Sequence, residues 1–332
     1  MTSSSATGTG PDSRGNPRRI GPYTVVTRVD TGVTAHTPVS EHRYIARSPD
    51  GDRTVLLSKP LETVDPQRFM TEADVSRYLL GPWVLPANEL SAPGEPAWHA
   101  RPYLPALPLP LALAVHGGPL PERTVRALAV ALAENLSLMH GQNLSHAGLC
   151  PSSVLIATDG PRLTCFGAVR AAAPDGAARK DLPGLDPGSL PPEQAAGGQP
   201  RPLGDVYALG ATLAYAATGH TMPEREELPS ALRTLVARCL SRDPVHRPQL
   251  SEIVGELLGD ARVGAPTGFA APTRADALLG PGWLPARLVA AIVHQSASVL
   301  AAEVRLPARA ASPAPSWPPP GSGPSPALHP SR

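Results

Sequence analysis

Cysteine is scarce in this chain of 332 residues, with Cys150, Cys165 and Cys239 as its only thiols. Three cysteines so far apart exclude the disulfide framework of a small secreted domain. Long apolar runs are also missing, because even residues 284–300 include an arginine, a histidine and a glutamine. The start of the chain lacks the apolar core of a signal peptide. We therefore expect a cytoplasmic protein with no membrane partner.

An excess of charge of either sign is missing as well. The chain has 29 basic and 28 acidic residues and a net charge of +1 at pH 7. It has no global field that would attract nucleic acid, so we expect no nucleic-acid partner, and any partner must be recognised at local sites. Lysine is nearly absent, since only Lys59 and Lys180 occur beside 43 prolines. This usage is typical of a GC-rich actinobacterial genome.

Composition and hydrophobic periodicity divide the chain into segments. Residues 1–19 and 307–332 contain few apolar side chains to offset the entropy of ordering, so we predict a disordered N-terminal segment and a disordered Pro-rich tail. Residues 20–104 contain the patterns of short strands, whereas residues 105–259 contain those of amphipathic helices. Residues 260–306 form a C-terminal extension in which we predict one amphipathic helix, either docked onto the helical part or free to bind a partner.

The two central segments predict an α+β fold. Strands are predicted at 23–28, 39–47 and 53–58, and they are followed by one helix within 65–80. Residues 121–140 repeat apolar side chains at steps of three and four, which is typical of a buried helix. The chain is therefore expected to form a small antiparallel β lobe with one helix and a larger helical lobe.

Short motifs in the second half occur in a characteristic order. They are HAGLCPSSVLIATDGPRLTCFGAVR (146–170), LPPEQ (190–194), GDVYALG (204–210) and CLSRDPVHRP (239–248). In this order they resemble the catalytic and metal-binding loops, the end of the activation segment, the supporting helix and the terminal element of bacterial, actinomycete-type serine/threonine protein kinases. The resemblance covers roughly residues 20–258 and implies the bilobal protein-kinase-like fold.

The scaffold of that family is retained. The resemblance implies a buried ion pair between Glu193 and Arg247, and a helix carboxylate, Asp205, that accepts backbone N–H groups of the catalytic loop. It also implies that a histidine and a phenylalanine of the two loops stack inside the helical lobe. The residues of this structural motif are His146, Phe166, Gly167, Glu193, Asp205 and Arg247.

The catalytic side chains of the family are missing. The resemblance places Gly148 at the catalytic carboxylate, Cys150 at the lysine that meets the transferred phosphate, and Ser153 and Cys165 at the two metal ligands. It places Ser58 at the phosphate-anchoring lysine of the small lobe. Phosphoryl transfer in this family depends on positioning and charge neutralisation by these groups, so the sequence has no intact catalytic residue and no metal site.

The resemblance therefore implies a degenerate member of the family, a pseudokinase with a regulatory or scaffolding role and a protein partner such as an active kinase or a regulatory protein. Residues 31–41 contain a single glycine where the family has three, and a phosphate cradle needs glycine for close backbone approach. We expect no cofactor, with ATP binding weak and Mg²⁺ not bound. The alternative is a weakly active or atypical ATP-dependent serine/threonine protein kinase, or a nucleotide sensor.

The nucleotide pocket has four candidate residues, Glu72, Arg101, Pro102 and Leu104. Glu72 matches the family's helix glutamate but has lost its lysine partner. It is either a surface residue or an ion-pair partner of Arg101, which falls at the back of the adenine pocket. The carbonyl of Pro102 and the N–H of Leu104 would still be able to meet an adenine edge. Lys59 follows the expected lysine position by one residue and should point away from the cleft, because strand side chains alternate.

Two of the substituted positions carry cysteines. Cys150 and Cys165 would both face the cleft, where cysteine can serve as a small apolar filler of an emptied polar site. The alternative is a redox-responsive or metal-responsive pair of thiols, which requires the two α-carbons to lie within about 7 Å of one another for a disulfide.

Overall fold

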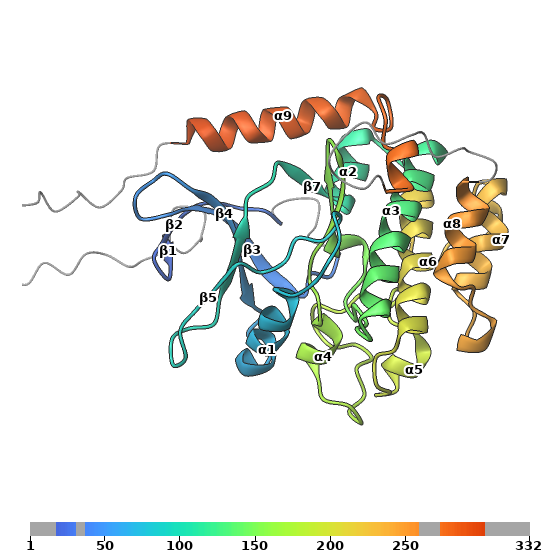
Figure 1. Ribbon diagram of the computed structural model, residues 1–332, viewed down its shortest axis with the longest axis horizontal. Coiled ribbons are helices and arrows are strands. Elements are labelled where there is room, and N and C mark those ends of the chain that lie inside the picture. Colours follow the sequence, from blue (N-terminus) through green and yellow to red (C-terminus); the bar gives the residue numbers. More distant parts are fainter. Residues whose placement is uncertain (1–17, 31–36, 259–272, 303–332) are drawn as a thin grey trace, which may run out of the picture.

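The computed structural model describes residues 18–30, 37–258 and 273–302 (Figure 1). The predicted disordered ends lie outside these ranges except for residues 18 and 19, and Arg19 belongs to a strand because it pairs with Thr24, so the boundary predicted at residue 19 is too late; most of the 31–41 loop also lies outside. A β-rich lobe with one helix stands beside a larger helical lobe, so the predicted α+β architecture is confirmed. No helix in the described part of the chain has both the length and the apolarity needed to cross a bilayer.

The small lobe is a six-stranded antiparallel sheet with the order β1-β2-β3-β4-β6-β5. Its strands are β1 (Arg19–Ile20), β2 (Tyr23–Arg28), β3 (Glu41–Arg47), β4 (Thr54–Pro60), β5 (Glu89–Leu90) and β6 (His99–Pro102). One face forms a compact apolar core around Tyr23, Leu57 and Trp98. Because side chains alternate along a strand, the opposite face is the one turned to the helical lobe.

Helix α1 (Pro66–Ser76) packs beside this sheet (Figure 1). It begins where the Asp65 carboxylate accepts the N–H groups of Gln67 and Arg68, with proline at the first helical position. It ends four residues earlier than the predicted limit of 80. The Ser76 hydroxyl donates to the carbonyl of Ala73 within the helix and accepts the N–H of Ala87. The second bond connects the end of α1 to the segment that leads into β5.

The large lobe is built around α3 (Glu122–Gly141), whose buried positions recur on nearly all sides because α6 and α8 both pack against it. Its other elements are β7 (Ala106–Pro108), α2 (Leu109–His116), β8 (Val154–Ala157), β9 (Gly160–Leu163), α4 (Ala168–Ala172), α5 (Pro192–Ala195), α6 (Pro202–Thr218), α7 (Ser230–Cys239) and α8 (Leu250–Leu258). Strands β7, β8 and β9 form a small antiparallel sheet. A Cβ on Gly210 of α6 would lie 2.5 Å from the Cβ of Cys239, so glycine permits the close approach of α6 and α7.

The C-terminal extension contains α9 (Ala286–Ala301), as predicted. Leu288, Ile292 and Val299 form its buried stripe, and the helix packs against α2 of the large lobe (Figure 1). The docked alternative for this helix therefore describes the structure.

Candidate functional site

The loop that resembles the catalytic loop is shaped by a buried carboxylate. Asp205 of α6 accepts the backbone N–H groups of His146 at 2.7 Å and Ala147 at 2.9 Å, and it contacts Nε2 of His140 at 2.9 Å. Ala147 has φ of +50°, a conformation that non-glycine residues seldom adopt. The Asp205 contacts hold the backbone in this shape, because each N–H left unpaired inside the lobe would cost free energy.

Gly148, which the resemblance places at the family's catalytic carboxylate, is closed in by backbone. A Cβ on Gly148 would lie 2.1 Å from the carbonyl oxygen of Cys165 and 3.0 Å from the Cβ of Ala168. Real Cβ atoms do not approach a carbonyl oxygen so closely. A side chain at Gly148 therefore requires the backbone around Cys165 to move.

The two cleft cysteines are uncharged. Cys150 and Cys165 are buried free thiols, and burial raises the pKa of Cys150 to about 11 and that of Cys165 to about 12. The Ser153 hydroxyl bonds to both the N–H and the carbonyl of Cys150, which closes a local turn. Within the described residues, no cluster of three His, Cys, Asp or Glu side chains has the spacing to hold a metal ion.

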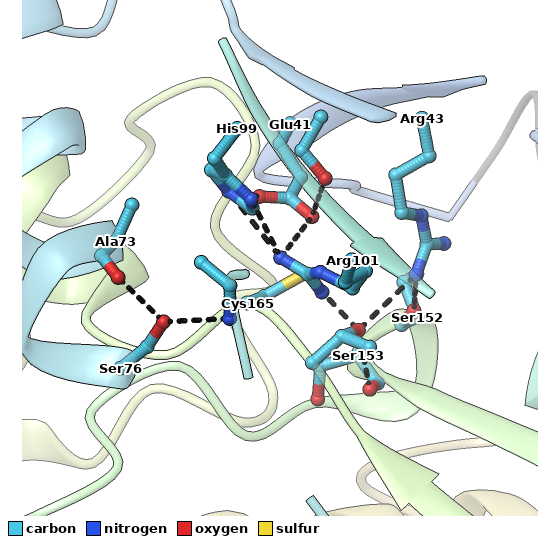
Figure 2. A network of polar contacts seen from close by, with 12 residues as sticks. Glu41, Arg43, Ala73, Ser76, His99, Arg101, Ser152, Ser153 and Cys165 are labelled. Atoms are coloured by element: carbon cyan, nitrogen blue, oxygen red, sulfur yellow. Dashed lines mark hydrogen bonds and ion pairs between the residues drawn. The ribbon is translucent and has the colours of Figure 1, made fainter. Parts of the chain in front are cut away.

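A polar network lies where the sheet of the small lobe faces the cleft (Figure 2). Ser58 of β4 donates its hydroxyl to Glu41 of β3 at 2.8 Å. Arg101 of β6 places Nη2 3.8 Å from the Glu41 carboxylate and 3.2 Å from Nδ1 of His99, while Nε2 of His99 lies 3.5 Å from Glu41. The strand register explains this cluster, because Ser58 lies opposite Arg43 on one side and His99 on the other, and facing residues share a face.

The charges in this network are set by burial. Burial disfavours the charged form of Glu41, but Arg101 and His99 outweigh it and hold the pKa of Glu41 well below its usual value. Burial and the Arg101 charge lower the pKa of His99, so this ring is neutral at pH 7. Lys59 pairs with His42 in the ladder and lies on the other face of the sheet.

Arg43 of β3 crosses the cleft between the lobes, a role that the sequence analysis missed. Its guanidinium is fully buried, binds the Asp30 carboxylate and donates from Nη1 to the carbonyl of Ser152 in the large lobe at 2.9 Å. Figure 2 shows Arg43 reaching toward Ser152 beside the Glu41 network. The signal that would have found it is the alternation Glu41-x-Arg43 in one strand and His99-x-Arg101 in another, which places polar residues on the inward face.

The predicted pairing of Glu72 with Arg101 is wrong. The Glu72 carboxylate is held instead by Arg170 of α4, whose Nε and Nη2 lie 2.9 and 2.8 Å from its two oxygens. Glu72 is not a surface residue either, because its side chain is only 15% exposed. The short helix α4 packs on α1 and brings Arg170 over Glu72, while Glu41 occupies Arg101. A Cβ on Gly167 would lie 2.1 Å from the Glu72 carboxylate, so glycine is required for this contact.

Two cavities between the lobes, both lined by described residues, are small. The cavity lined by residues such as Glu41, Glu72, Arg101 and Cys165 has a volume of about 30 Å³, and its neighbour beside Gly148 about 20 Å³. Ligand pockets usually measure some hundreds of Å³, so neither of these two cavities has room for a ligand of nucleotide size.

The strand that links the lobes leaves the sheet at Pro102. Pro102 is exposed and pairs with Val55 in the ladder, and the Tyr103 N–H donates to the carbonyl of Thr54 at 3.3 Å. Leu104 is partly buried and packs with Leu56 of the small lobe and Leu155 of β8, among others. The apolar side chain of Leu104 is therefore part of the contact between the lobes.

The scaffold residues lie together in the large lobe. Nη1 and Nη2 of Arg247 bind the two oxygens of Glu193 at 2.6 and 2.9 Å, and Nη1 also donates to the carbonyl of Leu203. The rings of His146 and Phe166 meet edge to face with centroids 5.8 Å apart. These contacts tie the ends of the 146–194 region to the helices behind it.

Sequence comparison finds related proteins among bacterial kinases, although no protein-family model matches the chain. It is 33% identical over 270 residues to the probable serine/threonine-protein kinase PkwA of Thermomonospora curvata, which covers 74% of this chain and 35% of that protein. It is 30% identical over 299 residues to the serine/threonine-protein kinase AfsK of Streptomyces coelicolor, which covers 83% of this chain and 36% of that protein. The chain thus spans about a third of the length of these relatives.

Comparison of structures agrees with this relationship at the level of the fold. The kinase domain of PknI from Mycobacterium tuberculosis superposes with a TM-score of 0.54 and 20% sequence identity, over 71% of this chain and 94% of that domain. The motif order, the fold and the related sequences therefore identify the chain as a domain with the protein kinase fold, related to the bacterial serine/threonine protein kinases.

Proposed function

We propose that this domain is a pseudokinase, which does not transfer phosphate and instead serves as a regulatory or scaffolding module for a protein partner. The observation that carries the proposal is the surrounding of Gly148. The position of the catalytic carboxylate has no side chain, and the carbonyl of Cys165 occupies the space that one would need. The substitution is thus accompanied by a backbone arrangement that fits only glycine.

The size of the missing contributions supports this proposal. A general base contributes roughly 100- to 10,000-fold to rate, and each group that stabilises developing charge contributes on the order of 3 kcal/mol. These contributions are not additive, but kinases turn over at only about 1 to 100 per second with all of them in place. Neutral thiols at Cys150 and Cys165 and a hydroxyl at Ser58 supply no charge to a phosphate or a metal.

The buried polar contacts of Arg43 and Arg101 argue against a nucleotide cofactor. Arg43 bridges the lobes through Ser152, and Arg101 is engaged by Glu41 and His99. A nucleotide would have to displace these buried charges from their partners, and breaking a buried ion pair costs about 3 to 5 kcal/mol. Such a loss would offset much of the binding energy that a nucleotide gains.

The proposal is tested with the purified full chain and ATP, with and without Mg²⁺ or Mn²⁺. We expect no transfer of labelled γ-phosphate to the chain or to a generic protein substrate, and no rise in the melting temperature up to millimolar ATP. Stabilisation that grows with ATP concentration as mass action requires would identify a nucleotide sensor instead. Transfer that a cleft substitution abolishes would identify an active kinase.

The variant Gly148→Asp separates a simple loss of the carboxylate from the steric closure described above. If the position were open, the new carboxylate would leave the melting temperature close to that of the parent chain, and transfer would stay absent in either case because the charged groups replaced by Ser58, Cys150 and Cys165 are missing too. We expect no transfer and a lower melting temperature, because the new side chain meets the carbonyl of Cys165. Gly141→Asp is the matched control, since a Cβ on Gly141 meets no atom within 4 Å.

A further inference from the structure

The extension that contains α9 is anchored firmly to the large lobe at its N-terminal end. The Thr124 hydroxyl of α3 donates to the carbonyl of Trp283 at 2.6 Å, and the indole N–H of Trp283 donates to the carbonyl of Thr158 at 2.8 Å. Leu288 and Ile292 are buried in the core of the same lobe. The first half of α9 therefore belongs structurally to the large lobe.

The other end of α9 reaches the small lobe. Nη2 of Arg47, the last residue of β3, donates to the carbonyls of Val299 and Leu300 at 2.9 and 3.1 Å. The carbonyls in the last turn of a helix lack partners within the helix and attract a cation. No basic residue lies in the last turn of α9 itself, so Arg47 supplies this cap from the other lobe. Figure 1 shows α9 running from α2 toward the strands of the small lobe.

From these contacts we infer that α9 is a strap between the lobes, which holds the small lobe in place and keeps the cleft closed. A helix of 16 residues is a rigid rod about 24 Å long. Because one end is built into the large-lobe core, the small lobe cannot rotate away without breaking the Arg47 contacts to the carbonyls of Val299 and Leu300. This role does not depend on whether the domain transfers phosphate.

The chain contains its own reporters of cleft opening. Cys150 and Cys165 line the small cavities between the lobes, whereas Cys239 lies in the large-lobe core. Burial raises the pKa of all three thiols to about 11 or 12, and a thiol reagent attacks only the exposed thiolate. Labelling of Cys165 therefore measures opening of the cleft, and labelling of Cys239 measures unfolding of the lobe.

The test is residue-resolved maleimide labelling of the full chain, read by mass spectrometry, for Arg47→Ala and its matched control Arg53→Ala. Arg53 pairs with Glu89 inside the small lobe and makes no hydrogen bond to α9. We expect Arg47→Ala to label Cys165 about tenfold faster, which corresponds to about 1.4 kcal/mol, with Cys239 unchanged and Arg53→Ala like the parent chain. Unchanged labelling of Cys165, or equal acceleration at Cys239, would overturn the inference.

A second pair of variants tests the helix rather than the arginine. Val299→Asp places a charge on the buried face near the small lobe, and Val293→Asp places the same charge on a face that is 59% exposed. Val299→Asp should accelerate the labelling of Cys165 without accelerating that of Cys239, while Val293→Asp should leave the labelling of Cys165 unchanged. Equal labelling in the two variants would show that α9 does not hold the lobes together. Because no nucleotide is present, this result is independent of the ATP experiments above.

Discussion

Replacing Arg43 by methionine removes a buried charge that connects the β lobe to the catalytic-type loop. The Arg43 side chain is fully buried and that of Asp30 is 3% exposed, so the substitution leaves a carboxylate without its partner in the interior. Removing one member of a buried ion pair costs about 3 to 5 kcal/mol. For a domain of this size, 1 kcal/mol corresponds to about 2 to 4 °C, so the melting temperature should fall by roughly 6 to 20 °C.

The companion variants assign this loss to the ion pair. The double variant Arg43→Met/Asp30→Leu has no buried charge without a partner at this place. We expect its free energy of unfolding to exceed that of Arg43→Met by about 2 kcal/mol. The remaining deficit reflects the carbonyl of Ser152, which keeps no partner from β3. Urea unfolding followed by tryptophan fluorescence gives the free energies. A loss below about 1 kcal/mol in the single variant, or strict additivity of the two substitutions, would refute the reasoning.

Further predictions concern protonation, packing and the contact between α1 and α4. Burial lowers the pKa of His146 to about 4, whereas a histidine in the unfolded chain has a pKa of about 6.5. Between these two pH values the unfolded chain binds a proton at His146 and the folded chain does not. The free energy of unfolding should therefore fall by up to about 1.4 kcal/mol per pH unit as the pH is lowered from about 6.5 toward about 4. In urea unfolding at several pH values, His146→Asn should flatten this slope, and an unchanged slope would exclude His146 as its source. Gly210→Ala should destabilise by about 1 to 3 kcal/mol because its Cβ meets Cys239, whereas Gly255→Ala, in open space on α8, should stabilise by about 0.5 to 1 kcal/mol. In thermal unfolding, the melting temperature should therefore fall for Gly210→Ala and rise for Gly255→Ala, and a shift in the same direction would contradict this prediction. Glu72→Gln weakens the bidentate contact with Arg170 of α4. Limited proteolysis in the segment that begins at residue 168 should therefore be faster. Unchanged cleavage would mean that other contacts hold α4.

The parts of the site that were predictable from sequence depend on short motifs. Asp205 and the Glu193–Arg247 pair make contacts that the motif order implies, because each motif specifies its own loop geometry. The polar face of the sheet was not predicted, although Glu41 and Arg101 each stand at an inward position of a strand. Their contact depends on the pairing of β3, β4 and β6, which residues far apart in the sequence create together.

The error over Glu72 has a related physical origin. A lost lysine leaves a carboxylate that must find another cation, and residues 20–104 suggested Arg101 as the nearest one. The actual donor, Arg170, comes from the opposite lobe, and the turn of helix that presents it spans only Ala168–Ala172. So short a helix has no hydrophobic period that a sequence pattern can reveal.

The environment of Gly148 also bears on how this domain can evolve. A kinase that has merely lost its carboxylate can recover it through one codon change. Under the proposed pseudokinase function, the first step back toward an acidic side chain collides with the carbonyl of Cys165, so it would reduce folding stability before any chemistry returned. Recovery would need the backbone of the 165–168 segment to shift first, a change that brings no benefit by itself. A series of single substitutions, each of which keeps the domain stable, therefore does not readily restore an acidic residue at position 148.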